Sequence, residues 1–432
     1  FGHGTQKVSL PEEHILDVLE GNPTPACDVK EATLECMRHP IGSKPLQEIV
    51  SKGDKVCIVC ADVTRIWNHS DQFVIYVVNE LNLAGIPDDD ISILFAQGTH
   101  REQTPEEDIM VVGEELTKRV KLYQHHCMNK DELVHVGDTS RGTPVWINKH
   151  AVEADKVIVI DGITTHLFAG YGGGRKLILP GVAGDDTIQI NHCHALGEKF
   201  GSGINPKTRS TLLTDNPVSD DMQEASDMIK PCFLVHSIIN SEGKICAMVG
   251  GDPYKAWLEG TKIVYRIQKV PFKAKCDVAF ACAGGYPKDV SLYQGCKCYD
   301  PSDVVTKEGG IIIAIMEASD IYEPPAYMGS FKYDTEEEME KAQNIYFLSP
   351  CLHKVLQSPV QPAAKKYAII DSIFKDESST LRKFLKVLCR NGNIKYIKDI
   401  FKAYYELWDK KEGIIRAEAV FAKKPSENRK EE

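Results

Sequence analysis

Three stretches decide the fold of this chain: KVCIVCADVTR (55–65), ISILFAQGTH (91–100) and KVIVIDGITTH (156–166). Each begins with an apolar run rich in Val and Ile and ends in polar or reactive residues. A helical pattern, DQFVIYVVNELNLAGI (71–86), follows the first stretch. Apolar strands that alternate with helices are buried on both faces. The pattern therefore predicts an α/β fold with a mixed or mostly parallel sheet and flanking helices.

The second stretch leads into a clear helix start. Thr104 is a favourable N-cap residue, Pro105 suits the first helical position, and Glu106 and Glu107 place acids in the first turn. Acidic side chains there complement the partial positive charge of a helix N-terminus. We therefore expect a helix to begin at Pro105.

The length of 432 residues predicts two domains, because one hydrophobic core rarely serves so long a chain. The strand–helix pattern pauses near 250–270, where PYKAWLEGTKIVYRIQKV is typical of a helix. A second series follows, with strands expected at 277–282, 309–319, 344–350 and 366–372 and a helix around 291–308. We predict a cofactor-anchoring and catalytic domain over 1–268, an α/β domain that closes the site over 269–405, and a C-terminal segment, 406–432. Whether that segment returns to the first domain is open, and its charged tail is expected to be disordered.

Composition argues against two classes of protein. With 51 Lys and Arg against 62 Asp and Glu, the net charge of −11 does not suit nucleic acid, which needs a basic face. No apolar run approaches the roughly 20 residues that span a bilayer. The first residues, FGHGTQKVSLPEEHI, lack the pattern of a signal peptide. We therefore expect a cytoplasmic protein that binds neither nucleic acid nor membranes.

The 14 cysteines lie mostly inside apolar runs, where cysteine acts as a small buried hydrophobe. Cys57 and Cys60 have the spacing of a redox or zinc pair. On a strand, however, these two side chains point to opposite faces, and no second pair follows. We expect both to be structural.

Reactive groups follow five of the predicted strands. In open α/β sheets, ligands bind outside the carboxyl ends of the strands, where helix N-termini converge. The groups are Asp62 with Arg65, His100, His166, the run Gly284-Gly285-Tyr286-Pro287, and Glu317. Their coincidence predicts a binding site at this edge.

Arg65 offers a fixed fork of donors that suits a carboxylate or a phosphate. Asp62, three residues earlier, could orient that fork or a sugar hydroxyl. A structural ion pair at the turn is the alternative. His100 and His166 could exchange protons near neutral pH. Either histidine alone could be structural or merely exposed, but two at neighbouring strand ends favour an acid/base pair.

Gly172, Gly173 and Gly174 precede Arg175 and Lys176. Such a run permits close backbone approach to a ligand or a nest of N–H groups for an anion. It is not a phosphate-binding P-loop, because Leu177 follows the lysine where a hydroxyl is required. A glycine-rich turn without a ligand remains an alternative.

His192 and His194 share a face on a strand but diverge on a helix. Metal sites draw on histidines at such spacings, so one of the two could be a ligand. The HExxH pattern of zinc hydrolases is absent. Further along, Gln294 and Lys297 share one helical face beside Tyr293. An amide and an ammonium there could bind the hydroxyl and carboxylate of a hydroxy acid; plain surface polarity is the alternative.

Together these motifs resemble one family. The chain carries DVTR at 62–65, GTH at 98–100, H-x-x-x-G-x-GGGRK at 166–176, NH at 191–192 and GGYPxD…YQ-x-x-K at 284–297. Their order and spacing are similar to those of the lactate racemases that use a nickel-pincer nucleotide. The resemblance runs from FGHG at the start into the second domain, and it implies an active site in the cleft between two domains.

The resemblance also implies roles for the residues. Lys176 would anchor the pyridinium-3,5-bisthiocarboxylic acid mononucleotide, and His192 would be the protein ligand of nickel. His100 and His166 would be the two catalytic bases. Arg65 would hold the substrate carboxylate, with help from Tyr293, Gln294 and Lys297. Asp62, Thr64 and the glycines 172–174 would contact the cofactor.

Such an enzyme would invert a 2-hydroxy acid by hydride transfer to and from the cofactor, because direct deprotonation beside a carboxylate has a high barrier. Separate cofactor-synthesis enzymes would load it. Ile66-Trp67 stands where many members have proline, which changes the pocket wall. The substrate is therefore expected to be lactate or an analogue such as malate or 2-hydroxyglutarate. A histidine-ligated metal-dependent lyase or hydrolase, and a non-catalytic nucleotide-binding sensor, are the alternatives.

Overall fold

The computed structural model describes residues 1–197, 203–286, 288–319, 363–373, 383 and 386. The chain divides into two compact units, Phe1–Lys332 and Tyr333–Glu432. Each unit is described by itself. The predicted boundary at 268 lies inside the first unit.

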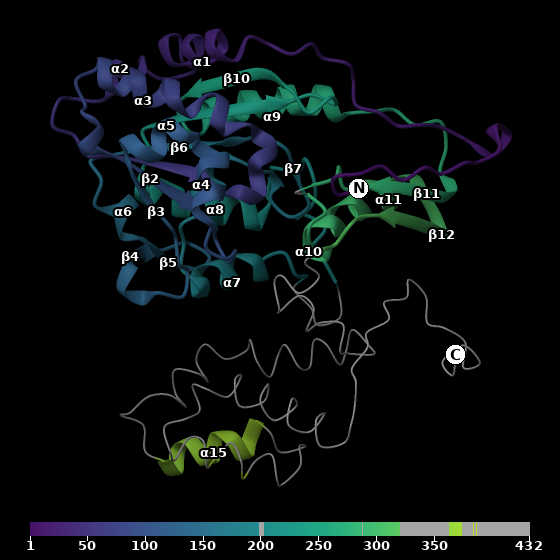
Figure 1. Cartoon of the computed structure of the whole chain (residues 1–432). Coiled ribbons are helices and arrows are strands. Elements are labelled where there is room, and N and C mark those ends of the chain that lie inside the picture. Colours follow the sequence, from purple (N-terminus) through teal and green to yellow (C-terminus); the bar gives the residue numbers. More distant parts are fainter. Residues whose placement is uncertain (198–202, 287, 320–362, 374–382, 384–385, 387–432) are drawn as a thin grey trace. The chain divides into compact units, whose positions relative to one another are not determined.

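A six-stranded sheet forms the centre of the first unit, in the order β10-β9-β6-β1-β2-β3 (Figure 1). All neighbouring strands are parallel except β10, which is antiparallel to β9. The predicted α/β fold with a mixed, mostly parallel sheet is therefore confirmed. The strands are β1 (Val56–Ala61), β2 (Ile91–Ala96), β3 (Lys121–Tyr123), β6 (Lys156–Gly162), β9 (Phe233–Ile239) and β10 (Ile245–Gly251).

Helices cover both faces of this sheet, because alternate side chains of each strand enter two separate cores. Cys57 and Val59 belong to one core, whereas Ile58 and Cys60 belong to the other. The structural reading of Cys57 and Cys60 is thus confirmed. One core is covered by α1 (Val29–Arg38), α2 (Leu46–Ile49), α3 (Val74–Leu83), α4 (Pro105–Val112) and α5 (Glu114–Arg119). The other is covered by α6 (Lys149–Val152), α7 (Asp185–Cys193), α8 (Pro217–Ile229) and α9 (Lys255–Gln268).

The predicted helix start at Pro105 is confirmed. The Thr104 side chain accepts a hydrogen bond from the backbone N–H of Glu107, and the Glu107 side chain accepts one from the backbone N–H of Thr104. This reciprocal capping box fixes the point at which the chain leaves the loop that carries His100.

A smaller sheet completes the described part of the first unit. Strands β11 (Cys276–Cys282) and β12 (Thr306–Ile315) pair in parallel. Between them lie α10 (Leu292–Gly295), the 3₁₀ helix η7 (Cys296–Cys298) and α11 (Tyr299–Val305), which fulfil the prediction of a helix around 291–308. Two short antiparallel pairs also occur: β4 (Leu133–Asp138) with β5 (Pro144–Asn148), and β7 (Thr165–His166) with β8 (Gly170–Tyr171).

The beginning of the chain is attached beside the smaller sheet. The Gly2 N–H donates to Oδ2 of Asp289 (2.7 Å), and the Tyr286 N–H donates to the Gly2 carbonyl (2.9 Å). The rings of His3 and Tyr286 are stacked, with centroids 4.3 Å apart. The segment before α1 therefore links the first helix of the large sheet with the loop after β11 (Figure 1).

In the second unit, the structure describes the helix α15 (Ala363–Ile373). The prediction of a strand at 366–372 is therefore wrong. Short apolar runs do not distinguish strand from helix, and the preceding Ala363, Ala364, Lys365 and Lys366 are good helix formers. The strand expected at 344–350 and the C-terminal segment 406–432 lie outside the described residues. Within the described part of the chain, no helix has the length and apolar character needed to cross a bilayer.

Candidate functional site

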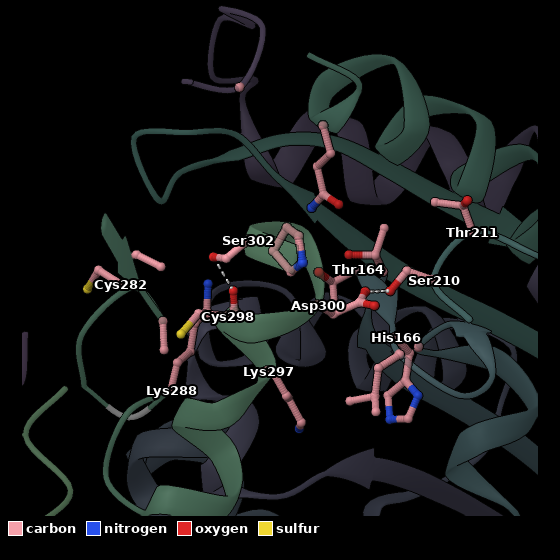
Figure 2. Close-up of a pocket in the computed structure, with 18 of the residues that line it drawn as sticks. Thr164, His166, Ser210, Thr211, Cys282, Lys288, Lys297, Cys298, Asp300 and Ser302 are labelled. Atoms are coloured by element: carbon pink, nitrogen blue, oxygen red, sulfur yellow. Dashed lines mark hydrogen bonds between the residues drawn. The ribbon is translucent and has the colours of Figure 1, made fainter. Parts of the chain in front are cut away.

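A cavity of about 870 Å³ opens at the carboxyl ends of β1 and β6. Its wall includes residues that follow these strands, the glycine loop, and the helices between β11 and β12. Of the predicted site residues, it is lined by Thr64, Arg65, His166, Gly172, Gly173, Lys176, Gln294 and Lys297. Figure 2 shows His166 and Lys297 on different walls of this cavity. Asp62, His100, Gly174, His192 and Tyr293 are not among its lining residues.

The partly buried His100 and the buried Asp62 form a pair at the ends of β2 and β1. Nδ1 of His100 lies 2.7 Å from Oδ2 of Asp62, whose other oxygen accepts a hydrogen bond from Oγ1 of Thr64 (2.6 Å). Burial alone would raise the pKa of Asp62, but His100, Arg65 and Thr64 together lower it below its usual value. The carboxylate therefore stays ionised and holds the proton of His100 on Nδ1. Nε2 then carries no proton, and it faces the side-chain amide of Gln294 at 3.5 Å.

His166 has the opposite arrangement. Its Nδ1 accepts hydrogen bonds from the backbone N–H groups of Phe168 and Ala169, both at 3.2 Å. Burial lowers the pKa of His166 well below 6.5, and the nearby charges of Lys176 and Lys297 lower it further. The ring is therefore neutral and carries its single proton on Nε2. The two histidines thus present opposite tautomers, so that Nε2 of His100 can accept a hydrogen bond and Nε2–H of His166 can donate one.

Lys176 lies in the 3₁₀ helix η6 (Gly174–Leu177), directly after the glycines. Burial lowers the pKa of its amine well below 10.5, and the positive charges of Arg65, Arg175 and Lys297 add to this effect. An uncharged lysine amine is a nucleophile, whereas an ammonium is not. The site therefore favours a Lys176 that can form a covalent bond.

His192 projects from α7, and this helical setting decides between the two histidines of this segment. Its Nδ1 donates to the carbonyl of Ile188 (2.9 Å), so the lone pair of Nε2 remains available to a metal. Burial lowers its pKa to about 4, which keeps the ring neutral. His194 diverges on the helix and directs Nε2 toward Thr143 (3.3 Å) and Asp221 (3.7 Å).

Arg65 lies in the 3₁₀ helix η2 (Val63–Asn68), and its Nη1 donates to Oγ1 of Thr64 (2.9 Å). Within the described residues, no carboxylate forms an ion pair with this guanidinium. The structure thus does not support the alternative of a structural Arg65–Asp62 ion pair. The fork is available for an anion in the cavity.

Gln294 connects the smaller sheet with the larger one. Its Oε1 accepts a hydrogen bond from Nζ of Lys297 (2.5 Å), and its Nε2 lies 3.5 Å from Nε2 of His100. Burial lowers the pKa of Lys297 to about 7, and Arg65 lowers it further. Nζ of Lys297 lies 5.9 Å from the centre of the Tyr293 ring, a cation–π contact with a residue that does not line the cavity.

Sequence reasoning missed three features of the cavity wall. Asp161 ends β6 much as Asp62 follows β1, and burial raises its pKa to about 6. Lys288 adds a cation 5.1 Å from the Trp67 ring. Ser210 donates to Oδ2 of Asp300 (2.5 Å), a bond that Figure 2 shows between segments 90 residues apart. Only for Asp161 did the sequence offer a signal, its place at a strand end.

Within the described part of the chain, no three His, Cys, Asp or Glu side chains gather closely enough to hold a metal by themselves. A metal held by the described residues would need most of its ligands from another molecule, and Nε2 of His192 is available as one protein donor. This donor set fits a cofactor that brings its own metal ligands.

Comparison with known proteins relates most of the chain to lactate racemases. The Lactate racemase N-terminal domain family matches residues 1–203, and the Lactate racemase C-terminal domain family matches 272–347. The lactate racemase of Lactiplantibacillus plantarum is 33% identical over 67% of this chain and 66% of its own length, so the chain spans slightly less than two thirds of that relative. The lactate racemase of Thermoanaerobacterium thermosaccharolyticum is 30% identical over 79% of both proteins.

The end of the chain has a different relative. Residues 332–432 match the ATP synthase delta (OSCP) subunit family. The ATP synthase subunit delta of Clostridioides difficile is 38% identical over 20% of this chain, which spans 48% of that protein. This match begins where the second compact unit begins.

A solved structure supports the similarity to lactate racemases. The lactate racemase apoprotein from Thermoanaerobacterium thermosaccharolyticum superimposes with a TM-score of 0.65 and 31% identity, over 74% of each chain. The sequence identity, the shared fold and the predicted motifs all agree, and the chain belongs to the lactate racemase family.

Proposed function

We propose that this protein racemises lactate or a similar short 2-hydroxy acid, with His100 and His166 as the proton-transferring residues. The observation that carries the proposal is the opposite hydrogen bonding of the two histidines at Nδ1, beside a Lys176 amine whose pKa burial lowers well below 10.5 and an Arg65 that pairs with no carboxylate among the described residues. Racemisation needs one group that takes the hydroxyl proton on one face and another that returns a proton on the opposite face.

The cavity suits a small carboxylate. Arg65, Lys288 and Lys297 line it and concentrate positive charge within it. In the proposed arrangement the Arg65 fork binds the substrate carboxylate, and Lys297 with Gln294 binds the hydroxyl or the second carboxylate oxygen. The unprotonated Nε2 of His100 then accepts the hydroxyl proton, while Asp62 stabilises the imidazolium that results. On the other face, the neutral His166 offers Nε2–H as a hydrogen-bond donor to the oxygen of the 2-oxo acid, and it returns a proton to that oxygen only after taking one from solvent to form its own imidazolium.

The donor set fits a nickel-pincer nucleotide. When bound, this cofactor supplies a site that accepts the C2 hydrogen as hydride and returns it. Lys176 would hold it through its uncharged amine, and His192 would offer Nε2 to the nickel. Asp62, Thr64 and the loop 172–174 would surround the nucleotide. Cofactor-synthesis enzymes would load the protein.

The domain assignment follows from the same arrangement. We propose that the region 1–268 anchors the cofactor and performs proton transfer, and that the site is closed by the racemase-like part of the predicted 269–405 domain, residues 272–347, through Gln294 and Lys297. A metal-dependent lyase or hydrolase that uses both His192 and His194 is disfavoured, since the His194 ring faces Asp221.

The decisive experiment starts with full-length protein produced together with the cofactor-synthesis enzymes and nickel. Pure L-lactate or D-lactate is then added, and both enantiomers are quantified by chiral chromatography, with malate and 2-hydroxyglutarate tested in parallel. We expect conversion of one enantiomer into its mirror image, about one nickel per chain and a mass increase at Lys176. His192→Ala should lose the nickel. Fully loaded protein that interconverts none of these acids would refute the proposal.

The second unit supports a separate proposal, which rests on the match of 332–432 to ATP synthase subunit delta. We propose that the part of this unit beyond the racemase match, residues 348–432, is a protein-binding module that takes no part in racemisation. A protease site after Phe347 in the loaded chain, where the match to the Lactate racemase C-terminal domain ends, tests this. Cleavage should leave the racemisation rate unchanged; a large loss of rate on cleavage would contradict the proposal.

A further inference from the structure

We propose that His236 and Trp257 are positioning residues that hold the glycine loop, Gly172–Gly174, and so keep the amine of Lys176 at the cavity wall. The inference rests on the proposed role of Lys176. Neither residue lines the cavity, and neither belongs to a motif that marks the site in the sequence. They approach the glycine loop from two different elements, β9 and α9.

His236 holds the loop by a hydrogen bond to its backbone. Its Nε2 accepts from the N–H of Gly174 (2.7 Å), and its Nδ1 lies 2.8 Å from the carbonyl of Val235. Nδ1 also lies 3.1 Å from the backbone N of Asp161. The shorter contact decides the tautomer: the Gly174 N–H can only donate, so Nε2 is the acceptor and the ring proton is on Nδ1, toward the Val235 carbonyl. Complete burial lowers the pKa of His236 to about 4, so this acceptor is maintained at neutral pH.

Trp257 holds the loop from the other side. Its Nε1–H donates to the carbonyl of Gly172 (2.8 Å). The guanidinium of Arg175 lies 3.9 Å from the centre of the same ring, a cation–π contact in a fully buried setting. Nη2 of Arg175 also donates to the carbonyl of Ala169 (2.9 Å) and to Oγ of Ser219 (2.7 Å). The residue directly before Lys176 is thus fixed as well.

The glycines themselves are explained by this packing. A Cβ on Gly173 would lie 2.9 Å from Cδ2 of His236, and one on Gly174 would lie 2.9 Å from Cδ1 of Trp257. Both also have positive φ angles, +73° and +57°. A Cβ on Gly172, by contrast, would make an ordinary 3.7 Å contact with Thr164. Two of the three glycines are therefore required by contact with the protein's own side chains.

The consequence falls on Lys176. Its backbone N–H donates to the carbonyl of Gly173 (3.2 Å), so the position of the side chain depends on the loop. Burial is the main reason that the pKa of Lys176 is low. A loosened loop would admit water to Nζ, and the pKa of the amine would rise toward its ordinary value.

The test measures the Lys176 amine in full-length protein without cofactor. The protein is exposed briefly to acetic anhydride between pH 6 and 10, and acetylation of Lys176 is quantified by mass spectrometry against the exposed Lys262. In the wild type, we expect Lys176 to reach half-maximal labelling at a much lower pH than Lys262. In Trp257→Phe, which keeps an aromatic ring but loses the N–H donor, and in His236→Leu, the midpoint should rise by about one pH unit or more. His236→Gln, whose amide oxygen can accept the hydrogen bond from Gly174, should restore much of the wild-type midpoint.

His125→Leu is the matched control. His125 is also a buried histidine, and its Nε2 bonds to the carbonyl of Ala183 (2.9 Å), but it does not contact the glycine loop. This variant should lose stability and keep the labelling midpoint of Lys176. Folded Trp257→Phe protein that labels like the wild type would overturn the inference, even if His236→Leu does not fold. Wild-type Lys176 that labels like Lys262 would instead refute the proposed role of the amine.

Discussion

The six-stranded sheet and the β11–β12 pair differ in how completely they are buried. Both faces of the large sheet are covered, and its central side chains, such as Phe95 and Ile58, have no exposed surface. On the small pair, Phe280 is 43% exposed and Ile311 is 57% exposed. Parallel strands are usually covered on both faces, so the small sheet is the less stable part of the first unit. His100, His166 and Lys176 lie in segments that follow strands of the large sheet. Gln294 and Lys297 lie in the helices between β11 and β12. We infer that rigid strand ends position the chemistry and that the less stable part adjusts to the substrate.

The largest expected effect is a loss of kcat in His166→Ala, and Lys297→Ala is the matching substitution in the other region. His166→Ala should reduce kcat about 10³-fold, because removing a positioned acid or base typically costs 10²–10⁴. Lys297→Ala should mainly raise KM, about tenfold, because it removes a substrate contact. Steady-state kinetics on loaded protein separates these effects. Equal losses of kcat in both variants would contradict the assignment of chemistry to one region and binding to the other.

Core substitutions test the difference in burial directly. Phe95→Ala should destabilise the protein by about 4 kcal/mol, because it leaves a cavity in a packed core. Phe280→Ala should cost roughly 1 kcal/mol or less, since its side chain is already nearly half exposed. Urea unfolding followed by circular dichroism measures both. Similar losses in the two variants would show that another segment covers Phe280 in solution.

Acid should destabilise the large sheet first. The buried His125 and His236 have pKa values lowered to about 4, so the unfolded chain binds protons that the folded one excludes. Their contribution is complete above pH 6.5 and is lost as the pH falls from 6.5 toward 4, on the order of 3 kcal/mol for each histidine. Asp161, with its pKa raised to about 6, opposes part of this loss. Stability measured from pH 7.5 to 4 should fall less steeply in His125→Gln, and a slope equal to that of the wild type would contradict this account.

The smallest expected effect concerns the helix caps. Thr104→Ala removes the capping box of α4 and should cost about 1 kcal/mol. Ser291→Ala removes the cap of α10, where Oγ accepts from the N–H of Gln294 (3.3 Å). Its cost in stability should be similar, but only this variant should raise KM, because Gln294 reaches the cavity from α10. Thermal unfolding and steady-state kinetics test the pair, and a raised KM in Thr104→Ala would weaken the division between the two regions.

Local sequence patterns predicted much of this molecule because they report local physics. The Val- and Ile-rich runs form the expected strands, and their ends place Asp62, Arg65, His100 and His166 near one edge. The capping residues at 104–107 likewise mark the start of α4. The same local reasoning was wrong at 366–372, where an apolar run of seven residues fits a helix as well as a strand.

The sequence by itself determined the α/β class, the edge at which the site lies and, through the resemblance of its motifs, the family. Only the tertiary structure decided the chemical state of the site. The pKa of the Lys176 amine is lowered well below 10.5 because burial and cations from distant segments, Arg65 and Lys297, act on it together. The Nε2 of His192 has no hydrogen-bond partner among the described residues, whereas the Nε2 of His194 faces Thr143 and Asp221, and His236 and Trp257 reach the glycine loop from 62 and 85 residues away. Solvation, charge and close packing depend on distances in space, and no local pattern in the sequence reports those distances.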